Sequence, residues 1–124
     1  MKIRSYAAVG VVATAVHYAV LIGAVESGLL APPWAAALGA WLGAQVAFAG
    51  NAAFTFDAPA SVRAWTRFQT VAVVGALISL SLVALGLHWH WPYLAAQVLA
   101  TAVAFFVTYE MNRRWSFAAR PIRA

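Results

Sequence analysis

The sequence predicts an all-α integral membrane protein whose four transmembrane helices form two repeated hairpins. Hydrophobic residues make up 65% of the chain and charged residues 9%, whereas a soluble domain carries about 25% charged residues. The apolar residues gather in four runs, each near the ~20 residues that a helix needs to cross a bilayer. Asn-Ala-Ala-Phe-Thr-Phe at 51–56 closes the second run, and Asn-Arg-Arg-Trp-Ser-Phe at 112–117 follows the fourth. Both endings place an Asn, an aromatic residue, a hydroxyl residue and a Phe at equal spacing, so we interpret the second half as a copy of the first.

Turns and charged residues separate the predicted spans, which cover residues 6–25, 33–54, 68–87 and 93–111. The first span is longer than the ~7–15 apolar residues of a signal peptide and further spans follow it, so we interpret it as transmembrane. A proline-containing turn precedes the second span, a loop with Pro59 and Arg63 precedes the third, and His88-Trp89-His90-Trp91-Pro92 precedes the fourth. We expect residues 1–124 to form one membrane domain.

The basic residues all fall on one side of this arrangement. They are Lys2, Arg4, Arg63, Arg67, Arg113, Arg114, Arg120 and Arg123. Lys and Arg concentrate in cytoplasmic segments, so this asymmetry predicts a multi-pass protein with both termini and the middle loop in the cytoplasm. The net charge of +5 therefore marks the cytoplasmic face and anionic lipid, and we expect no nucleic-acid partner. The aromatic residues expected at the outer interface are Trp34, Trp89, Trp91 and Tyr93.

Small residues recur at every fourth position on two predicted spans. The second span carries Ala35, Gly39, Gly43 and Ala47, and the fourth carries Ala96, Ala100, Ala104 and Thr108. Such stripes let helix backbones approach closely. The pattern predicts tight helix packing and leaves open whether it lies within one chain or between chains.

A few polar residues lie inside the predicted spans, where polar groups are costly and often functional. They are Thr14, His17 and Gln45. His17 has two open interpretations, a neutral imidazole hydrogen-bonded to another helix and a proton-linked role. We expect Gln45 to form an interhelical hydrogen bond. The chain has no cysteine, and His88 and His90 lack a third ligand, so we expect no metal and no cofactor.

Three short motifs at the span ends carry a family resemblance. The opening Arg4-x-Tyr6-x-x-Val9-Gly10-x-x-x-Thr14 and the two Asn-containing endings are the first two, and Arg67-Phe68 with Val74-Gly75 resembles a stretched second opening. In this order the motifs resemble the GtrA-like family of small four-span membrane proteins. One departure is that Ala52 and Ala53 stand where the second ending has Arg113 and Arg114.

The resemblance implies translocation of a polyprenyl-phosphate-linked sugar, or a related lipid carrier, across a bacterial-type cytoplasmic (inner) membrane for cell-surface polysaccharide synthesis. The residues expected to bind the lipid phosphate are Arg4, Arg67, Asn51, Asn112, Arg113, Arg114 and Glu110. Glu110 precedes the last two arginines by one helical turn, which predicts an ion pair that is either structural or part of the headgroup site. The arginines at span ends serve topology or bind phosphate through paired hydrogen bonds, and both interpretations stay open.

The partners expected from this interpretation are the polyprenyl-phosphate-linked sugar, membrane lipids, a membrane glycosyltransferase and further copies of the chain, with a dimer favoured. The chain carries no nucleotide motif, and we expect no enzymatic activity. One alternative is a membrane adaptor that recruits or stabilises a glycosyltransferase without moving lipid. Another is a small multidrug-type exporter, which uses a carboxylate in the middle of its first span. Here the corresponding span has only Glu26, at its outer end.

Overall fold

The computed structural model describes residues 3–54, 61–111 and 114–115. Within them the chain forms four α-helices: α1 (Ile3–Glu26), α2 (Pro32–Phe54), α3 (Val62–His88) and α4 (Tyr93–Met111). These helices coincide with the four predicted spans, except that α1 and α3 begin earlier. α3 begins at Val62 because the side chain of Ser61 accepts a hydrogen bond of 3.0 Å from the Ala64 amide, a helix N-cap.

Two short connections reverse the chain. After α1, Gly28 adopts a left-handed backbone with φ of +76°, and the Leu29 amide donates back to the Ala24 carbonyl at 3.0 Å. This is the usual way in which a glycine ends a helix. After α3, His90 adopts the left-handed backbone conformation with φ of 63°, and the Trp91 amide donates a hydrogen bond of 2.9 Å to the Gly86 carbonyl. Each connection thus folds two consecutive helices into an antiparallel pair.

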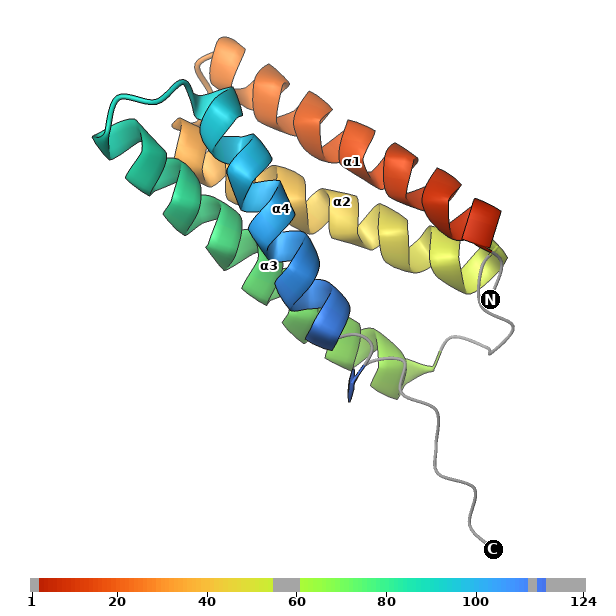
Figure 1. The fold of residues 1–124 in the computed structure, drawn as a ribbon. Helices are drawn as coiled ribbons and strands as arrows, with labels where there is room; N and C mark the ends of the chain where they lie inside the picture. Colours follow the sequence, from red (N-terminus) through yellow and green to blue (C-terminus); the bar gives the residue numbers. More distant parts are fainter. Residues whose placement is uncertain (1–2, 55–60, 112–113, 116–124) are drawn as a thin grey trace, which may run out of the picture.

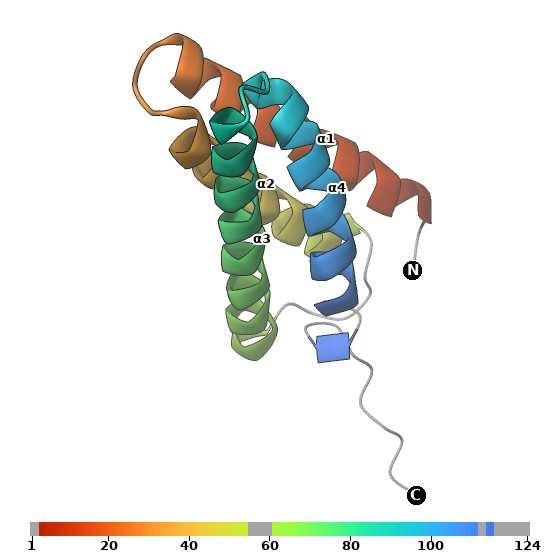
Figure 2. The ribbon, with the colours of Figure 1, turned by 60° about the vertical axis from the view of Figure 1, so that its left-hand side comes forward.

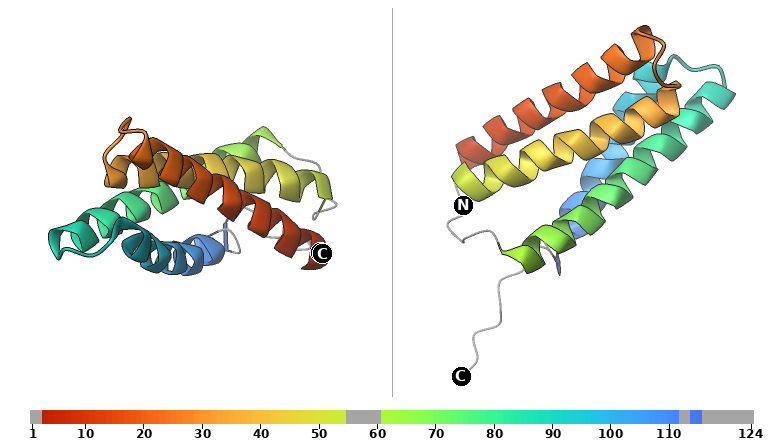
Figure 3. Two further views of the ribbon diagram at one scale, coloured as in Figure 1. Left: turned by 90° about the horizontal axis from the view of Figure 1, so that it is seen from above. Right: turned by 180° about the vertical axis from the view of Figure 1, so that it is seen from behind.

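The helices form an elongated bundle in which α2 packs between α1 and α3, and α4 packs on α3 (Figures 1 and 3). Both connections lie at one end of the bundle, which we name the turn end. The beginnings of α1 and α3 and the ends of α2 and α4 lie at the other end, which we name the terminal end (Figure 1). α1 and α4 lie close together at the turn end and separate towards the terminal end (Figures 1 and 2).

The predicted small-residue stripes pack within the chain. A Cβ atom added to Gly39 would lie 2.5 Å from the His17 carbonyl oxygen, and one added to Gly43 would lie 2.8 Å from that of Ala13. These glycines therefore bring the backbones of α1 and α2 into direct contact. On the second stripe, Ala96 faces Gly86 across the α3–α4 contact. The structure thereby resolves the question that the sequence left open, because both stripes form contacts between helices of one chain.

Small side chains make up much of the interior, and many of the bulky apolar side chains point outward. The buried cluster at the turn end consists of Leu21, Ala35, Ala36, Val83, Ala96 and Ala100. Exposed large apolar side chains are spread over all four helices and include Val11, Trp34, Leu77, Val98 and Phe106. A soluble protein of this size would bury such residues, so this distribution fits a bundle surrounded by lipid.

Among the described residues, three helical segments are long and apolar enough to cross a membrane: Arg4–Glu26, Val62–His88 and Tyr93–Met111. α2 is not among them although it has 23 residues. It carries no charged residue, but it contains Pro32, Pro33, Gln45 and Asn51, which lower its mean hydropathy. The chain is therefore a membrane protein with several apolar helices.

Candidate functional site

Three of the charged candidates that the structure describes, Arg67, Glu110 and Arg114, lie at the terminal end of α3 and α4. Arg114 Nε donates to Glu110 Oε2 at 3.0 Å, one helical turn apart, so the predicted ion pair forms. The two side chains are 74% and 45% exposed. The bond engages Nε, so the outer edge of the guanidinium faces the surroundings. Asn112 and Arg113, the other two candidates here, lie outside the described residues.

A second arginine joins this cluster from α3. Arg67 Nη1 donates to the Trp115 carbonyl oxygen at 3.2 Å, and its guanidinium carbon lies 5.5 Å from the centroid of the Trp115 ring. An exposed cation–π contact of this kind contributes about 0.5–1 kcal/mol. It ties the beginning of α3 to the residues that follow α4. Trp115 was not among the predicted site residues, although an aromatic residue directly after Arg114 was a signal that could have identified it.

The cluster forms a hollow of about 540 Å³, lined by Glu110, Met111, Arg114 and Trp115. The C-terminal end of a helix is slightly negative and repels an anion. The Glu110–Arg114 pair is neutral as a whole and fixes one edge of the Arg114 guanidinium, and Arg67 beside Trp115 gives the cluster a net positive charge that offsets the helix end. A planar guanidinium held in this way can offer paired hydrogen bonds to a phosphate, while Met111 and Trp115 supply an apolar wall. We name these four residues with Arg67 the basic hollow.

The candidates on the first two helices do not form part of the basic hollow. Arg4 is exposed near the beginning of α1, and this end of α1 lies apart from the end of α4 (Figures 1 and 2). Asn51, near the end of α2, is only 8% exposed, and its Oδ1 atom is buried without a hydrogen-bond partner. The equivalent of the arginine pair is absent here, since Ala52 and Ala53 follow directly.

Gln45 forms the interhelical hydrogen bond that its position predicts. Its Nε2 donates to Gln69 Oε1 at 2.8 Å, and Gln69 Nε2 donates back to Gln45 Oε1 at 2.6 Å. The reciprocal pair joins α2 to α3. The sequence interpretation missed Gln69 as the partner, because it placed this residue at the very start of the third span. Thr14, the remaining uncharged candidate on α1, is exposed.

His17 lies in a polar group that joins α1 to α3 and α4. The imidazole is buried beside the side chain of Gln97 and the backbone of Ala36. Gln97 Nε2 donates to Thr101 Oγ1 at 3.1 Å and to Ser79 Oγ at 3.4 Å. The hydroxyls of Tyr18 and Thr101 are 2.8 Å apart. We name His17, Tyr18, Ser79, Gln97 and Thr101 the polar layer. Of these, only His17 was predicted, although Gln97 and Thr101 one helical turn apart were a visible signal.

Two buried atoms of the polar layer form no well-aligned hydrogen bond, although the imidazole lies beside the Gln97 side chain. They are His17 Nε2 and Gln97 Oε1. Gln97 is fully buried and His17 is 9% exposed. An unpaired polar atom costs roughly 1–3 kcal/mol in a protein interior, and water is not at hand in a bilayer to satisfy it. The polar layer therefore retains the capacity to bind a further polar group.

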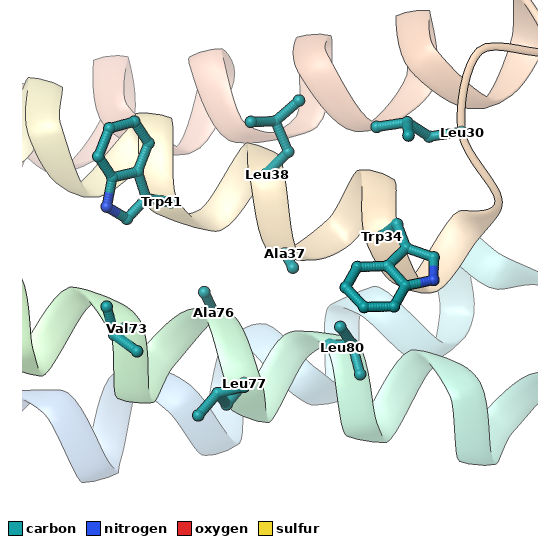
Figure 4. A pocket seen from close by; sticks show the side chains of 9 residues that line it. All are labelled: Leu30, Trp34, Ala37, Leu38, Trp41, Val73, Ala76, Leu77 and Leu80. Carbon is teal, nitrogen blue, oxygen red and sulfur yellow. The ribbon is translucent and has the colours of Figure 1, made fainter.

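An apolar groove runs between α2 and α3 on the outside of the bundle (Figure 4). It encloses about 440 Å³ and is lined by Leu30, Trp34, Ala37, Leu38, Trp41, Val73, Ala76, Leu77 and Leu80. Figure 4 shows that Trp34 and Trp41 project from α2 and that Val73, Leu77 and Leu80 project from α3. Apart from the indole N–H groups of Trp34 and Trp41 the lining is apolar, so this groove suits a hydrocarbon chain.

Comparison with known proteins identifies one family. The model of the GtrA/DPMS transmembrane domain matches residues 5–121. No curated protein and no solved structure matches the chain.

Proposed function

The chain belongs to the GtrA/DPMS transmembrane domain family, and from this premise we propose that it moves a polyprenyl-phosphate-linked sugar, or a related lipid carrier, across the cytoplasmic membrane for the synthesis of cell-surface polysaccharide. The family match supports a membrane function related to glycosyl carriers. The observation that carries the finer proposal is the basic hollow, which combines a fixed guanidinium with an apolar wall at one end of a lipid-embedded bundle.

The proposed orientation places the terminal end in the cytoplasm. The described basic residues Arg4, Arg63, Arg67 and Arg114 lie at or near this end, where Lys and Arg are expected on the cytoplasmic side. At the turn end, Trp34, Trp89 and Trp91 are exposed, and tryptophan favours the membrane interface. In this orientation the basic hollow lies at the depth where a carrier phosphate resides.

We further propose that α2 crosses the membrane as a fourth span and that the two hairpins are copies of each other. Gly39 and Gly43 hold α2 directly against α1, and the reciprocal pair with Gln69 satisfies the Gln45 side chain in the middle of α2. A helix shielded in this way needs less hydropathy of its own to remain in a bilayer. The apolar groove between α2 and α3 then faces the acyl chains and can hold part of the polyprenyl chain.

The proposed partners besides the carrier are a membrane glycosyltransferase and a second copy of the chain. Because the small-residue stripes are occupied within the chain, a second copy would pack through another, bulkier face. We propose no enzymatic activity and no cofactor. A glycosyltransferase adaptor would share the fold and the family, and only the movement of lipid separates it from the proposed function.

The experiment is reconstitution of the purified protein in liposomes that contain a polyprenyl-phosphate-linked sugar in both leaflets. A probe that cannot cross the bilayer, such as a sugar-specific lectin or an impermeant oxidant, is added outside the liposomes. It reports the rate at which carrier molecules reach the outer leaflet. We expect the parent protein to accelerate this transfer and Arg114→Ala to slow it. Protein-free liposomes and Arg123→Ala are the controls. If the parent transfers no carrier but copurifies with a glycosyltransferase, the adaptor is correct.

A further inference from the structure

Consecutive helices and the pair α1–α4 are held together in different ways. In the described part of the chain, α1–α2, α2–α3 and α3–α4 pack closely along their backbones. α1 and α4 meet instead through long side chains. Tyr18 reaches Thr101, and at the turn end Tyr93 OH donates to Glu26 Oε1 at 2.8 Å. We name this contact the α1–α4 seam. It closes the bundle between the first and the last helix.

The seam also widens towards the proposed cytoplasmic side. α1 and α4 separate towards the terminal end (Figures 1 and 2), where α4 ends in Glu110, Met111 and the basic hollow. Contacts through side chains break by rotamer changes, whereas α2 and α3 pack closely along their backbones and cannot part without moving whole helices. Of the two lines of contact that join the first helix pair to the second, the seam is therefore the one that can open.

Polar groups occur at two levels along the seam, and α4 carries a third group beyond it. The polar layer lies in the middle of the seam, the Glu26–Tyr93 bond lies at the turn end, and the Glu110–Arg114 pair lies at the terminal end of α4. In the middle, His17 Nε2 and Gln97 Oε1 are buried without a well-aligned hydrogen bond. A sugar hydroxyl is both donor and acceptor, so a single hydroxyl can bond to both atoms. By contrast, the groove between α2 and α3 is almost entirely apolar.

From these observations we infer that the α1–α4 seam is the lateral gate through which the sugar headgroup crosses, with the polar layer as its binding site at mid-membrane. The inference rests on the proposed function and adds the route. The phosphate enters from the basic hollow, the hydroxyls of the sugar bond to the polar layer in place of the Tyr18–Thr101 contact, and the polyprenyl chain remains in lipid outside the bundle. No covalent step is involved.

The test uses reversible crosslinking, for which the absence of cysteine provides a clean background. Tyr18→Cys with Thr101→Cys places two thiols across the seam. Gln45→Cys with Gln69→Cys is the matched control, because it also replaces a partly buried, hydrogen-bonded pair between the two hairpins. A bis-methanethiosulfonate reagent joins the thiols of each pair, and a reducing agent releases them. Carrier transfer is measured in liposomes before crosslinking, after it and after reduction.

We expect crosslinking of the seam to reduce transfer to the rate of protein-free liposomes, and reduction to restore it. The crosslinked control is expected to transfer carrier at its uncrosslinked rate. Binding of carrier to the cytoplasmic face is expected to persist in both, because the basic hollow is untouched. If the Tyr18 and Thr101 substitutions impair folding, Glu26→Cys with Tyr93→Cys places the same crosslink at the turn end.

The outcomes separate the two proposals. Carrier transfer that continues through a crosslinked seam overturns the gate while leaving the proposed function in place, and so does equal loss in the seam and the control pair. A parent protein that transfers no carrier at all overturns the proposed function, and the gate with it.

Discussion

The two helical hairpins hold their helices together through different kinds of contact. In the α1–α2 hairpin, Gly39 and Gly43 lie directly against the backbone of α1. At the positions that correspond to them in the predicted repeat, the α3–α4 hairpin has Ala100 and Ala104. There a hydrogen bond of 3.4 Å from Gln97 to Ser79 joins α4 to α3. The first hairpin is therefore a closely packed scaffold without an arginine pair at its end, and the second is a looser hairpin that ends in the Glu110–Arg114 pair.

The largest expected effect is the loss of the scaffold. Gly43→Leu forces a side chain into the Ala13 carbonyl, which a Cβ atom alone would approach to 2.8 Å. Overpacking typically costs about 1–3 kcal/mol, and here backbone faces backbone, so we expect the upper part of this range. Gly10→Leu is the control, because no atom lies within 4 Å of its added Cβ. The thermal unfolding midpoints of the Gly43→Leu and Gly10→Leu variants are measured in the same detergent. Equal midpoints would show that the α1–α2 contact is not tight.

The second expected effect concerns the charged end of the second hairpin. Arg114→Ala removes the guanidinium that Glu110 orients, and we expect carrier binding to weaken by roughly 1–3 kcal/mol. Arg114→Lys keeps the charge but not the paired geometry, so it should lie between the parent and the alanine variant. The control is Arg4→Ala on the first hairpin.

Binding of a polyprenyl-phosphate-linked sugar to equal amounts of folded protein distinguishes these variants. A loss for Arg4→Ala as large as that for Arg114→Ala would place the headgroup site between the hairpins instead of on the second one.

A third prediction separates stability from function inside the membrane. Gln97→Leu removes one hydrogen bond to Ser79 on α3 and one to Thr101 within α4, and interhelical hydrogen bonds in membranes average only about 0.6 kcal/mol. We therefore expect little change in the unfolding midpoint but a loss of carrier transfer. Gln45→Leu should show the opposite pattern, because it leaves Gln69 without its reciprocal partner. Transfer that survives Gln97→Leu would contradict a role for the polar layer.

The substitutions with the smallest expected effect on the protein test whether both hairpins have the same orientation in the membrane. Single cysteines at Leu29, Val62 and Trp89 occupy exposed positions at the two ends of the bundle. If α2 spans the membrane, an impermeant thiol reagent added outside intact cells should label Leu29→Cys and Trp89→Cys but not Val62→Cys. Labelling of Val62→Cys from outside would show that α2 does not cross.

The sequence interpretation was accurate where a feature is local along the chain. Apolar runs and turn residues predicted the four helices, and a spacing of one helical turn predicted the Glu110–Arg114 pair. The Asn51 and Asn112 motifs marked helix ends but could not show that Asn51 is buried.

Contacts between distant helices were not predictable from such patterns. The pairing of side chains between helices depends on how far each helix is rotated about its axis and on where it begins. Two such pairs are Gln45 with Gln69 and Arg67 with Trp115. The N-cap at Ser61 adds more than one helical turn before the predicted third span, which brings Arg67 into α3 and places Gln69 beyond its first turn. For the same reason the polar layer was represented only by His17, because the alignment of α1 with α4 is a tertiary feature.

The unequal lengths of α3 and α4 bear on the membrane itself. α3 has 27 residues and α4 has 19, which at 1.5 Å per residue corresponds to about 40 Å and about 28 Å. A hydrocarbon layer of roughly 30 Å cannot match both, so α3 must tilt or project from the surface while lipids beside α4 thin to meet it. Such local thinning shortens the distance that a polar headgroup must travel past α4. Carrier transfer should accordingly be faster in bilayers of shorter acyl chains, where hydrophobic mismatch against α4 is least.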